Sequence, residues 1–156
     1  MLDIHSRANA RRLGIWLSCA LLLACTDRPG SPEEAVRAWV TEAVAAAENK
    51  DRRELLSLIS PNYVDARGNE RDDVGNLLRV YFLRQQKVAI MSKVQQITML
   101  GDTAAEVSLT AGMAGTNDSV LGLSADAYQF EFDLENAGDE WLLLGARWGG
   151  LGEELH

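Results

Sequence analysis

The side chain with the most distinctive chemistry in this sequence is the thiol of Cys25, which ends the run Leu22-Leu23-Ala24-Cys25. Near neutral pH a sulfur nucleophile is far more reactive than a hydroxyl, so a thiol is what a covalent alkylation of the chain requires. The chain has one other cysteine, Cys19, which lies inside the apolar stretch before Cys25. Cys25 is therefore the candidate for covalent modification.

The residues that precede Cys25 have the pattern of an export signal. Arg7, Arg11 and Arg12 come before a mostly apolar run over residues 13–24, which is 12 residues long. A helix that crosses a bilayer needs about 20 apolar residues. A basic start, a short apolar core and small residues near its end are typical of a secretory signal. The sequence therefore predicts a signal peptide over residues 1–24 and no permanent membrane span.

The end of this segment resembles the lipobox of bacterial lipoproteins. In that family the cysteine is alkylated with a diacylglyceryl group, the peptide is cut just before it, and the new amino terminus is acylated. The resemblance implies a palmitate-type anchor on Cys25, a lipidated tether over residues 25–30 and a periplasm-facing protein of the cell envelope. Thr26 follows Cys25, which favours the outer membrane over the inner. The alternative is an ordinary signal peptide with a chance cysteine.

Charge is distributed unevenly along the chain. The net charge is −8, and removal of the signal peptide would make it −10. Residues 25–93 carry 11 basic and 11 acidic residues, whereas residues 94–156 carry Arg147 against 11 acidic residues. Phosphate contacts need Lys and Arg, so this distribution argues against a nucleic-acid partner. Solubility is the simplest reason for an acidic half.

Histidine chemistry, metal chemistry and nucleophilic catalysis all lack support in the sequence. The histidines are His5, in the predicted signal, and His156, the last residue. No His-Glu-x-x-His or cysteine pair is present, and the alternating acids of residues 131–135 are typical of a solvated strand face. We therefore expect no metal and no cofactor.

Three helices are expected in the first half of the domain. Ser31, Pro32 and Glu34 form the pattern of a capped helix start, and apolar residues at spacings of three and four continue it to about residue 48. Asp51 repeats the capping pattern for a short helix that Pro61 ends. A third helix follows Asn69 as its expected cap and buries Val74, Leu77, Leu78, Tyr81 and Phe82.

After residue 86 the apolar period changes to two, which predicts strands. The expected strands cover residues 88–100, 105–111, 127–134 and 140–148, with turns at 101–102 and 136–139. The last strand is expected to place Leu142, Leu144 and Ala146 on one face. Residues 112–126 are small, polar and rich in glycine, and we expect a mobile loop there that carries Val120, Leu121 and Leu123. Residues 151–156 are expected to form a frayed tail.

Helices followed by an antiparallel sheet form an α+β order. Together with the stretch from Asp51 to Pro61, Tyr63 shortly after it and the paired last strands, this order resembles the nuclear transport factor 2-like, or SnoaL-like, superfamily. The resemblance covers about residues 31–149. It implies a cone-shaped domain over residues 31–150, in which a curved antiparallel sheet wraps three amino-terminal helices around an apolar pocket.

Two functions follow as hypotheses. The first is a non-catalytic, lipid-anchored envelope module that binds a small apolar molecule or peptide, or an envelope protein, through Tyr81, Tyr128 and the apolar residues of the loop: Val120, Leu121 and Leu123. The alternative, which the resemblance implies, is a small isomerase or dehydratase. Its acid and phenol would come from Asp65, Asp126, Tyr63 or Tyr128. The oligomeric state is left open, a dimer included.

Overall fold

The computed structural model describes residues 30–116, 123–138 and 140–156. Helices α1 (Pro32–Glu48), α2 (Arg52–Ser57) and α3 (Arg71–Arg84) precede strands β1 (Lys87–Leu100), β2 (Ala104–Thr116), β3 (Leu123–Asn136) and β4 (Trp141–Gly150). The predicted signal peptide and Cys25 lie outside the described residues, so lipidation stays a prediction. Within the described ranges no helix has the length and apolarity needed to cross a membrane.

Local capping chemistry sets the first helix starts. The hydroxyl of Ser31 accepts a hydrogen bond from the Glu34 N–H at 3.2 Å, and the Asp51 carboxylate accepts one from the Glu54 N–H at 3.0 Å. Each bond satisfies a backbone donor that has no partner inside the helix. The cap predicted for the third helix is wrong: Glu70 is the N-cap of α3, because the Asn69 side chain bonds elsewhere.

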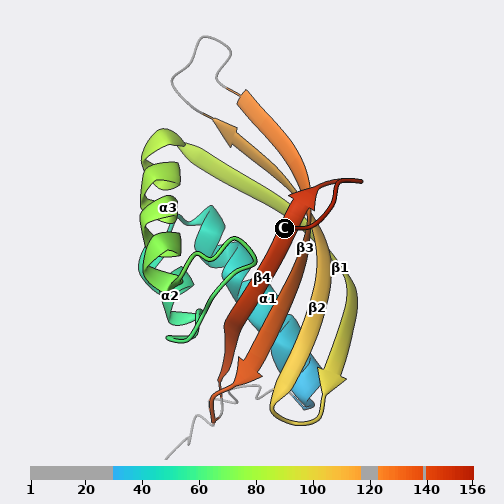
Figure 1. Cartoon of the computed structure of the whole chain (residues 1–156). Helices are drawn as coiled ribbons and strands as arrows, with labels where there is room; N and C mark the ends of the chain where they lie inside the picture. The colour runs from blue at the N-terminus through green and yellow to red at the C-terminus, as the bar shows by residue number, and fades with distance from the viewer. Residues whose placement is uncertain (1–29, 117–122, 139) are drawn as a thin grey trace, which may run out of the picture.

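The sheet is antiparallel throughout, in the order β1-β2-β3-β4, and it curves around the helices. Figure 1 shows α1 crossing the strands on the concave side, with α3 on the same side. The ring of Trp39 on α1 meets Phe132 on β3 edge-on, with centroids 5.9 Å apart. The predicted α+β class and the curved antiparallel sheet are confirmed. The core joins α1 to the inward residues of β2: Ala105, Val107, Leu109 and Ala111.

Two register shifts change which residues face inward. One lies in β1 between Val94 and Gln96, and the other places Leu144 opposite no residue of β3. Such a bulge adds one residue to a strand. The side chains that face inward therefore change from odd-numbered to even-numbered positions, or the reverse, and the strand bends. The buried hydrophobic side chains of β4 are therefore those of Trp141 and Leu143 before the bulge and Ala146 after it. The prediction that Leu142, Leu144 and Ala146 share the covered face is wrong, because only Ala146 of these three is buried.

The long loop predicted over residues 112–126 is wrong for residues 112–116 and 123–126, which belong to strands, and residues 117–122 lie outside the described residues. β2 continues to Thr116 and β3 begins at Leu123, and these two residues pair across the sheet. Pairing with a neighbouring strand overrides the weak strand preference of Ala and Gly in this stretch. Val120 and Leu121 lie outside the described residues.

The carboxyl-terminal tail folds back on β4 instead of fraying. Trp148 and His156 exchange two backbone hydrogen bonds, at 3.1 and 3.2 Å. A Cβ atom at Gly149 would lie 2.6 Å from the Glu154 carbonyl oxygen. The absence of a side chain at Gly149 is thus what lets the tail approach the strand so closely.

Candidate functional site

An apolar cavity of about 440 Å³ lies between α3, the concave face of the sheet and the segment after α2. Its walls include seven aromatic residues, and Asp65 is the one charged residue among the described residues that line it. A volume of this size is in the usual range for small-molecule sites. The aromatic lining residues are Tyr63, Tyr81, Phe82, Tyr128, Phe130, Phe132 and Trp148.

The segment of residues 58–66 brings Tyr63 and Asp65 to this cavity by pairing with the edge of β4. Ser60 donates its N–H to the Leu143 carbonyl at 2.9 Å, and Ala66 donates to the Ala146 carbonyl at 3.0 Å. Pro61 prevents α2 from continuing, so the chain passes into this extended course. Side chains two apart in an extended chain share a face. Tyr63 and Asp65 accordingly point inward, at 4% and 5% exposure, while Val64 is 51% exposed.

The Asp65 carboxylate is held by three hydrogen bonds. Its Oδ1 accepts from the N–H groups of Arg67 at 2.9 Å and Asn69 at 2.8 Å, and its Oδ2 accepts from the Asn69 side-chain amide at 2.8 Å. All three donors are neutral N–H groups, and none of the ion pairs found among the described residues involves Asp65. The carboxylate is therefore fixed in orientation, with acceptor capacity left on Oδ2.

Tyr63 lines the same cavity as this carboxylate. Burial first, and then the negative charge of Asp65, raise the pKa of the Tyr63 phenol well above its usual value. The phenol stays protonated at any ordinary pH and can act as a hydrogen-bond donor. None of the hydrogen bonds found among the described residues involves its hydroxyl group, and this oxygen is not one of the buried polar atoms that lack a partner, so the hydroxyl keeps some accessible surface although the residue as a whole is buried. A phenol on the wall of a cavity, whose hydroxyl keeps accessible surface and has no partner among the described residues, has its donor available for a ligand.

A second group of polar side chains lies at the end of the cavity near the start of β3. Tyr81 on α3 and Tyr128 on β3 both line the cavity. Burial, then the charge of Asp126 and then Tyr128 raise the pKa of Tyr81. Asp126 itself is exposed. Its carboxylate therefore acts on Tyr81 from an exposed position.

The structure brings together most of the predicted site residues that it describes. Asp65, Tyr63, Tyr81 and Tyr128 line one cavity, whereas Asp126 is exposed and is not among its lining residues. Leu123 begins β3. The loop assignment is wrong for this residue because it belongs to a paired strand, and its role in binding stays a prediction. The sequence prediction also missed Phe130 and Phe132, which line the cavity. Both continue the alternation that begins at Tyr128, so the same pattern could have identified them.

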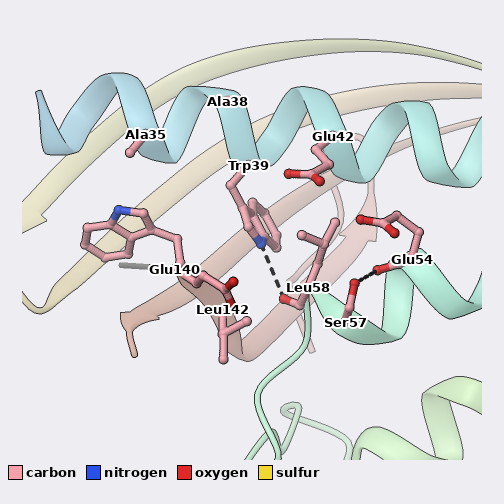
Figure 2. Close-up of a pocket in the computed structure, with 10 residues that line it drawn as sticks. Ala35, Ala38, Trp39, Glu42, Glu54, Ser57, Leu58, Glu140 and Leu142 are labelled. Carbon is pink, nitrogen blue, oxygen red and sulfur yellow. Dashed lines mark hydrogen bonds between the residues drawn. The ribbon is translucent and has the colours of Figure 1, made fainter. Parts of the chain in front are cut away.

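A second hollow, of about 310 Å³, lies between α1, α2 and the start of β4. Figure 2 shows Glu42 and Glu54 extending into it beside Trp39, whose Nε1 donates to the Leu58 carbonyl at 3.3 Å. Partial burial, the hydrogen bond with Glu54 and the charges of Glu54 and Glu140 raise the pKa of Glu42. No group of acidic, histidine or cysteine side chains in the described part of the chain is arranged to hold a metal ion.

Comparison with known proteins identifies the fold. No protein-family profile matches the chain, and no curated protein matches it. A provisionally assigned scytalone dehydratase from Novosphingobium aromaticivorans is similar in structure, with a TM-score of 0.70 and 11% identity over 76% of this chain and 83% of that one. A ketosteroid isomerase-like protein from Erwinia carotovora atroseptica has a TM-score of 0.63 and 13% identity over 76% and 95%.

A nuclear transport factor 2-like superfamily protein from Salmonella enterica is similar as well, with a TM-score of 0.64 and 12% identity over 79% of this chain and 96% of that one. At such low identity these likenesses establish the fold alone, which is nuclear transport factor 2-like. The fold hosts more than one chemistry, so the function has to be argued from the site.

Proposed function

We propose that the protein takes a small apolar molecule into the central cavity and moves a proton on it, in a dehydration or an isomerisation. The observation that carries this proposal is the pairing of Tyr63 and Asp65. Tyr63, whose hydroxyl forms no hydrogen bond with a described residue, and the buried Asp65 line one apolar cavity. The two groups have complementary abilities, because the phenol donates a proton and the carboxylate accepts one.

The roles follow from the chemistry of the two groups. Oδ2 of Asp65 would remove a proton from a carbon next to a carbonyl group, and the Tyr63 hydroxyl would donate a hydrogen bond to the oxygen on which negative charge develops. In an isomerisation the same proton returns at another carbon. In a dehydration the proton leaves with a hydroxyl group as water. The apolar walls strengthen both interactions because they exclude solvent.

The structural neighbours support this choice of reaction class. One is named as a dehydratase and another as ketosteroid isomerase-like, and both share the fold at TM-scores of 0.70 and 0.63. These names belong to those proteins. For this chain they favour proton-transfer chemistry in the cone over a purely structural role.

A second candidate is a non-catalytic module that binds its ligand at the envelope membrane. Its support is the state of Asp65, whose carboxylate already accepts three hydrogen bonds and could serve only to hold the 65–69 turn. The lipobox pattern at Cys25 supports a lipid anchor, a periplasmic position and the outer membrane as the expected site. The anchor is compatible with either function, since residues 26–30 separate it from α1.

Exchange of carbon-bound hydrogen with solvent tests the reaction directly. The purified protein is incubated in D₂O with a panel of cyclic ketones and β-hydroxy ketones, and deuterium at the α-carbon is followed by NMR. We expect exchange above buffer for at least one compound and its loss in Tyr63→Phe. Asp65→Asn should abolish it too, but can disturb the turn. The control Thr41→Val removes an exposed hydroxyl from α1. Binding without exchange across the panel would favour the second candidate.

A further inference from the structure

The outer side of α3 leaves apolar side chains in solvent. Leu77, Val80 and Leu83 are 57%, 47% and 78% exposed. They follow one another at a spacing of three residues, which places successive side chains next to each other on a helix. Figure 1 shows α3 at the edge of the molecule, with the sheet on its other side. The helix therefore presents apolar surface outward as well as toward the cavity that it lines.

Basic side chains accompany these apolar residues. Arg79, Arg84 and Lys87 are exposed, and residues 74–101 contain no acidic residue, in a chain whose net charge is −8. None of the ion pairs found among the described residues involves these three side chains. The acids of α3 itself lie in its first turn, at the opposite end of the helix. The last two turns of α3 and the start of β1 thus combine apolar surface with positive charge that no ion pair compensates.

Acidic side chains of the sheet lie on the opposite side of the molecule. Glu106 on β2 pairs with Asp133 on β3, and Glu135 continues the same alternation. Because the residues next to them in sequence belong to the core, these three carboxylates face away from the helices. Opposite charges on opposite sides orient a protein in the field of a charged surface. An anionic surface would therefore meet the side of α3.

The central cavity opens on that same side. Leu77 and Tyr81 line the cavity, and yet they are 57% and 36% exposed. A residue that lines a cavity and is also exposed lies at the edge of its opening. A surface that contacts the outer side of α3 would therefore lie next to the entrance of the cavity.

A lipid on Cys25 is compatible with this orientation. Nζ of Lys50, just after α1, donates to the Gln85 carbonyl at 3.0 Å, which places the carboxyl-terminal ends of α1 and α3 side by side. The 17 residues of α1 span about 25 Å. The six residues 25–30 reach at most about 20 Å from Ser31. One bilayer surface can therefore hold the anchor and contact the end of α3, with α1 lying along it.

We propose that the outer side of α3 docks on an anionic phospholipid bilayer. The apolar side chains enter the headgroup region and the basic side chains meet the phosphates. Docking places the entrance of the cavity against the bilayer, from which an apolar ligand can enter. The inference draws on the proposed anchor and is independent of the proposed proton transfer. The docking surface consists of Leu77, Arg79, Val80, Leu83, Arg84 and Lys87.

Charge also decides against a second copy of the chain as the occupant. Two copies that met through this surface would each bring the same basic residues to the contact, and like charges that face each other weaken an interface. A bilayer that contains acidic lipid supplies the complementary charge.

The test uses a fluorescent label whose emission is quenched by brominated lipid tails. The full chain is purified and incorporated into phosphatidylcholine vesicles with or without phosphatidylglycerol. The label is attached at Leu83→Cys on α3, and the parent chain treated alike gives the background from its own cysteines. Met91→Cys is the matched control, because Met91 is 84% exposed on the sheet face away from the helices. We expect quenching at residue 83 on vesicles with phosphatidylglycerol only, and none at residue 91.

Charge variants then test the basic residues. In Arg79→Gln/Arg84→Gln the ratio of docked to free α3 should fall about thirtyfold, because each basic residue near an anionic surface contributes about fivefold. Arg37→Gln/Lys93→Gln removes two charges elsewhere and should change this ratio little.

Several results would overturn the proposal: equal quenching at residues 83 and 91, no quenching at residue 83, quenching that is the same without phosphatidylglycerol, or equal effects of the two double variants. Emission at residue 83 that changes with protein concentration in the absence of vesicles would assign the surface to a second copy and overturn it as well. Palmitate labelling reads the anchor separately, and a chain without lipid is tested by adding it to preformed vesicles. The deuterium exchange of the proposed reaction is measured without vesicles, so its failure leaves this inference unaffected.

Discussion

The side-chain amide of Asn69 donates a hydrogen bond to Oδ2 of Asp65 at 2.8 Å, and the backbone N–H of the same residue donates to Oδ1 at the same distance. One residue thus holds both oxygens of the buried carboxylate that lines the cavity. Gly68, with φ of +80°, lets the chain turn tightly enough for this to happen. The carboxylate reaches the cavity in a fixed orientation because the turn of residues 65–69 closes on it.

Replacement of Asn69 by alanine should destabilise the protein by about 1.5–3 kcal/mol, the usual range for hydrogen bonds to a charged group. The reason is that Oδ2 of the buried Asp65 loses its side-chain donor. Urea unfolding gives the measurement. Asn62→Ala is the control, because Asn62 is exposed and uses only its backbone N–H in a hydrogen bond. Equal midpoints for the two variants would show that the Asn69 amide contributes nothing to the turn.

Trp39→Ala should cost about 3–5 kcal/mol, as for other buried tryptophans. Trp39 is 6% exposed, packs edge-on against Phe132 and donates its Nε1 proton to Leu58. The matched control is Leu83→Ala on the outer side of α3, where the side chain is 78% exposed and should matter little. Chemical denaturation compares the two, and an unchanged midpoint for Trp39→Ala would contradict the packing of α1 against the sheet.

Gly149→Ala should release the tail from β4. Its methyl group would lie 2.6 Å from the Glu154 carbonyl oxygen, a distance that forces the tail to move. The amide of His156, which bonds to Trp148, should then exchange its hydrogen faster. Gly112→Ala on β2 serves as the comparison, since its added methyl would meet nothing within 4 Å. Protection of the His156 amide that is the same in both variants would contradict the prediction.

Glu42→Gln should stabilise the protein at neutral pH. The folded pKa of Glu42 lies above its usual 4.5, so folding favours the protonated side chain. That stabilisation is fully present below about pH 4.5 and is lost as the pH rises through the raised pKa. Glutamine imitates the protonated form, so the gain should appear at neutral pH, stay below about 1 kcal/mol and vanish near pH 4.

Thermal unfolding at the two pH values measures the effect of Glu42→Gln. Glu33→Gln is the control, because Glu33 forms an exposed ion pair with Arg37 at 2.8 Å and has no reason to gain stability. A gain for Glu42→Gln that is the same at both pH values would show that charge is not its cause.

Cys25→Ser should abolish lipid attachment and leave the domain folded. The thiol is required for alkylation, and Cys25 precedes the Ser31 cap of α1 by six residues, outside the apolar stripe of that helix. Metabolic labelling with a palmitate analogue, followed by urea unfolding of the purified variant, measures both properties. Label retained by the serine variant would rule out Cys25 as the acceptor.

The sequence by itself determined the elements whose causes are local. Ser31 and Asp51 start helices because each side chain reaches a backbone donor three residues away. The alternation in β3 determined which of its residues face inward, since the side-chain period of a strand is fixed by backbone geometry. The spacing of Tyr63 and Asp65 carried a signal of the same kind, because residues two positions apart share a face in an extended chain.

Only the tertiary structure decided the features that depend on partners distant in the sequence. The side chain of Asn69 could either cap a helix or bind Asp65. It binds Asp65 because the fold places it beside that buried carboxylate. The bulge at Leu144 is a property of two paired strands, so no reading of β4 alone could place Leu143 inward. Tyr63, Tyr81 and Tyr128 line one cavity because of the way the sheet curves around the helices. That curvature is set by long-range packing and not by local propensity.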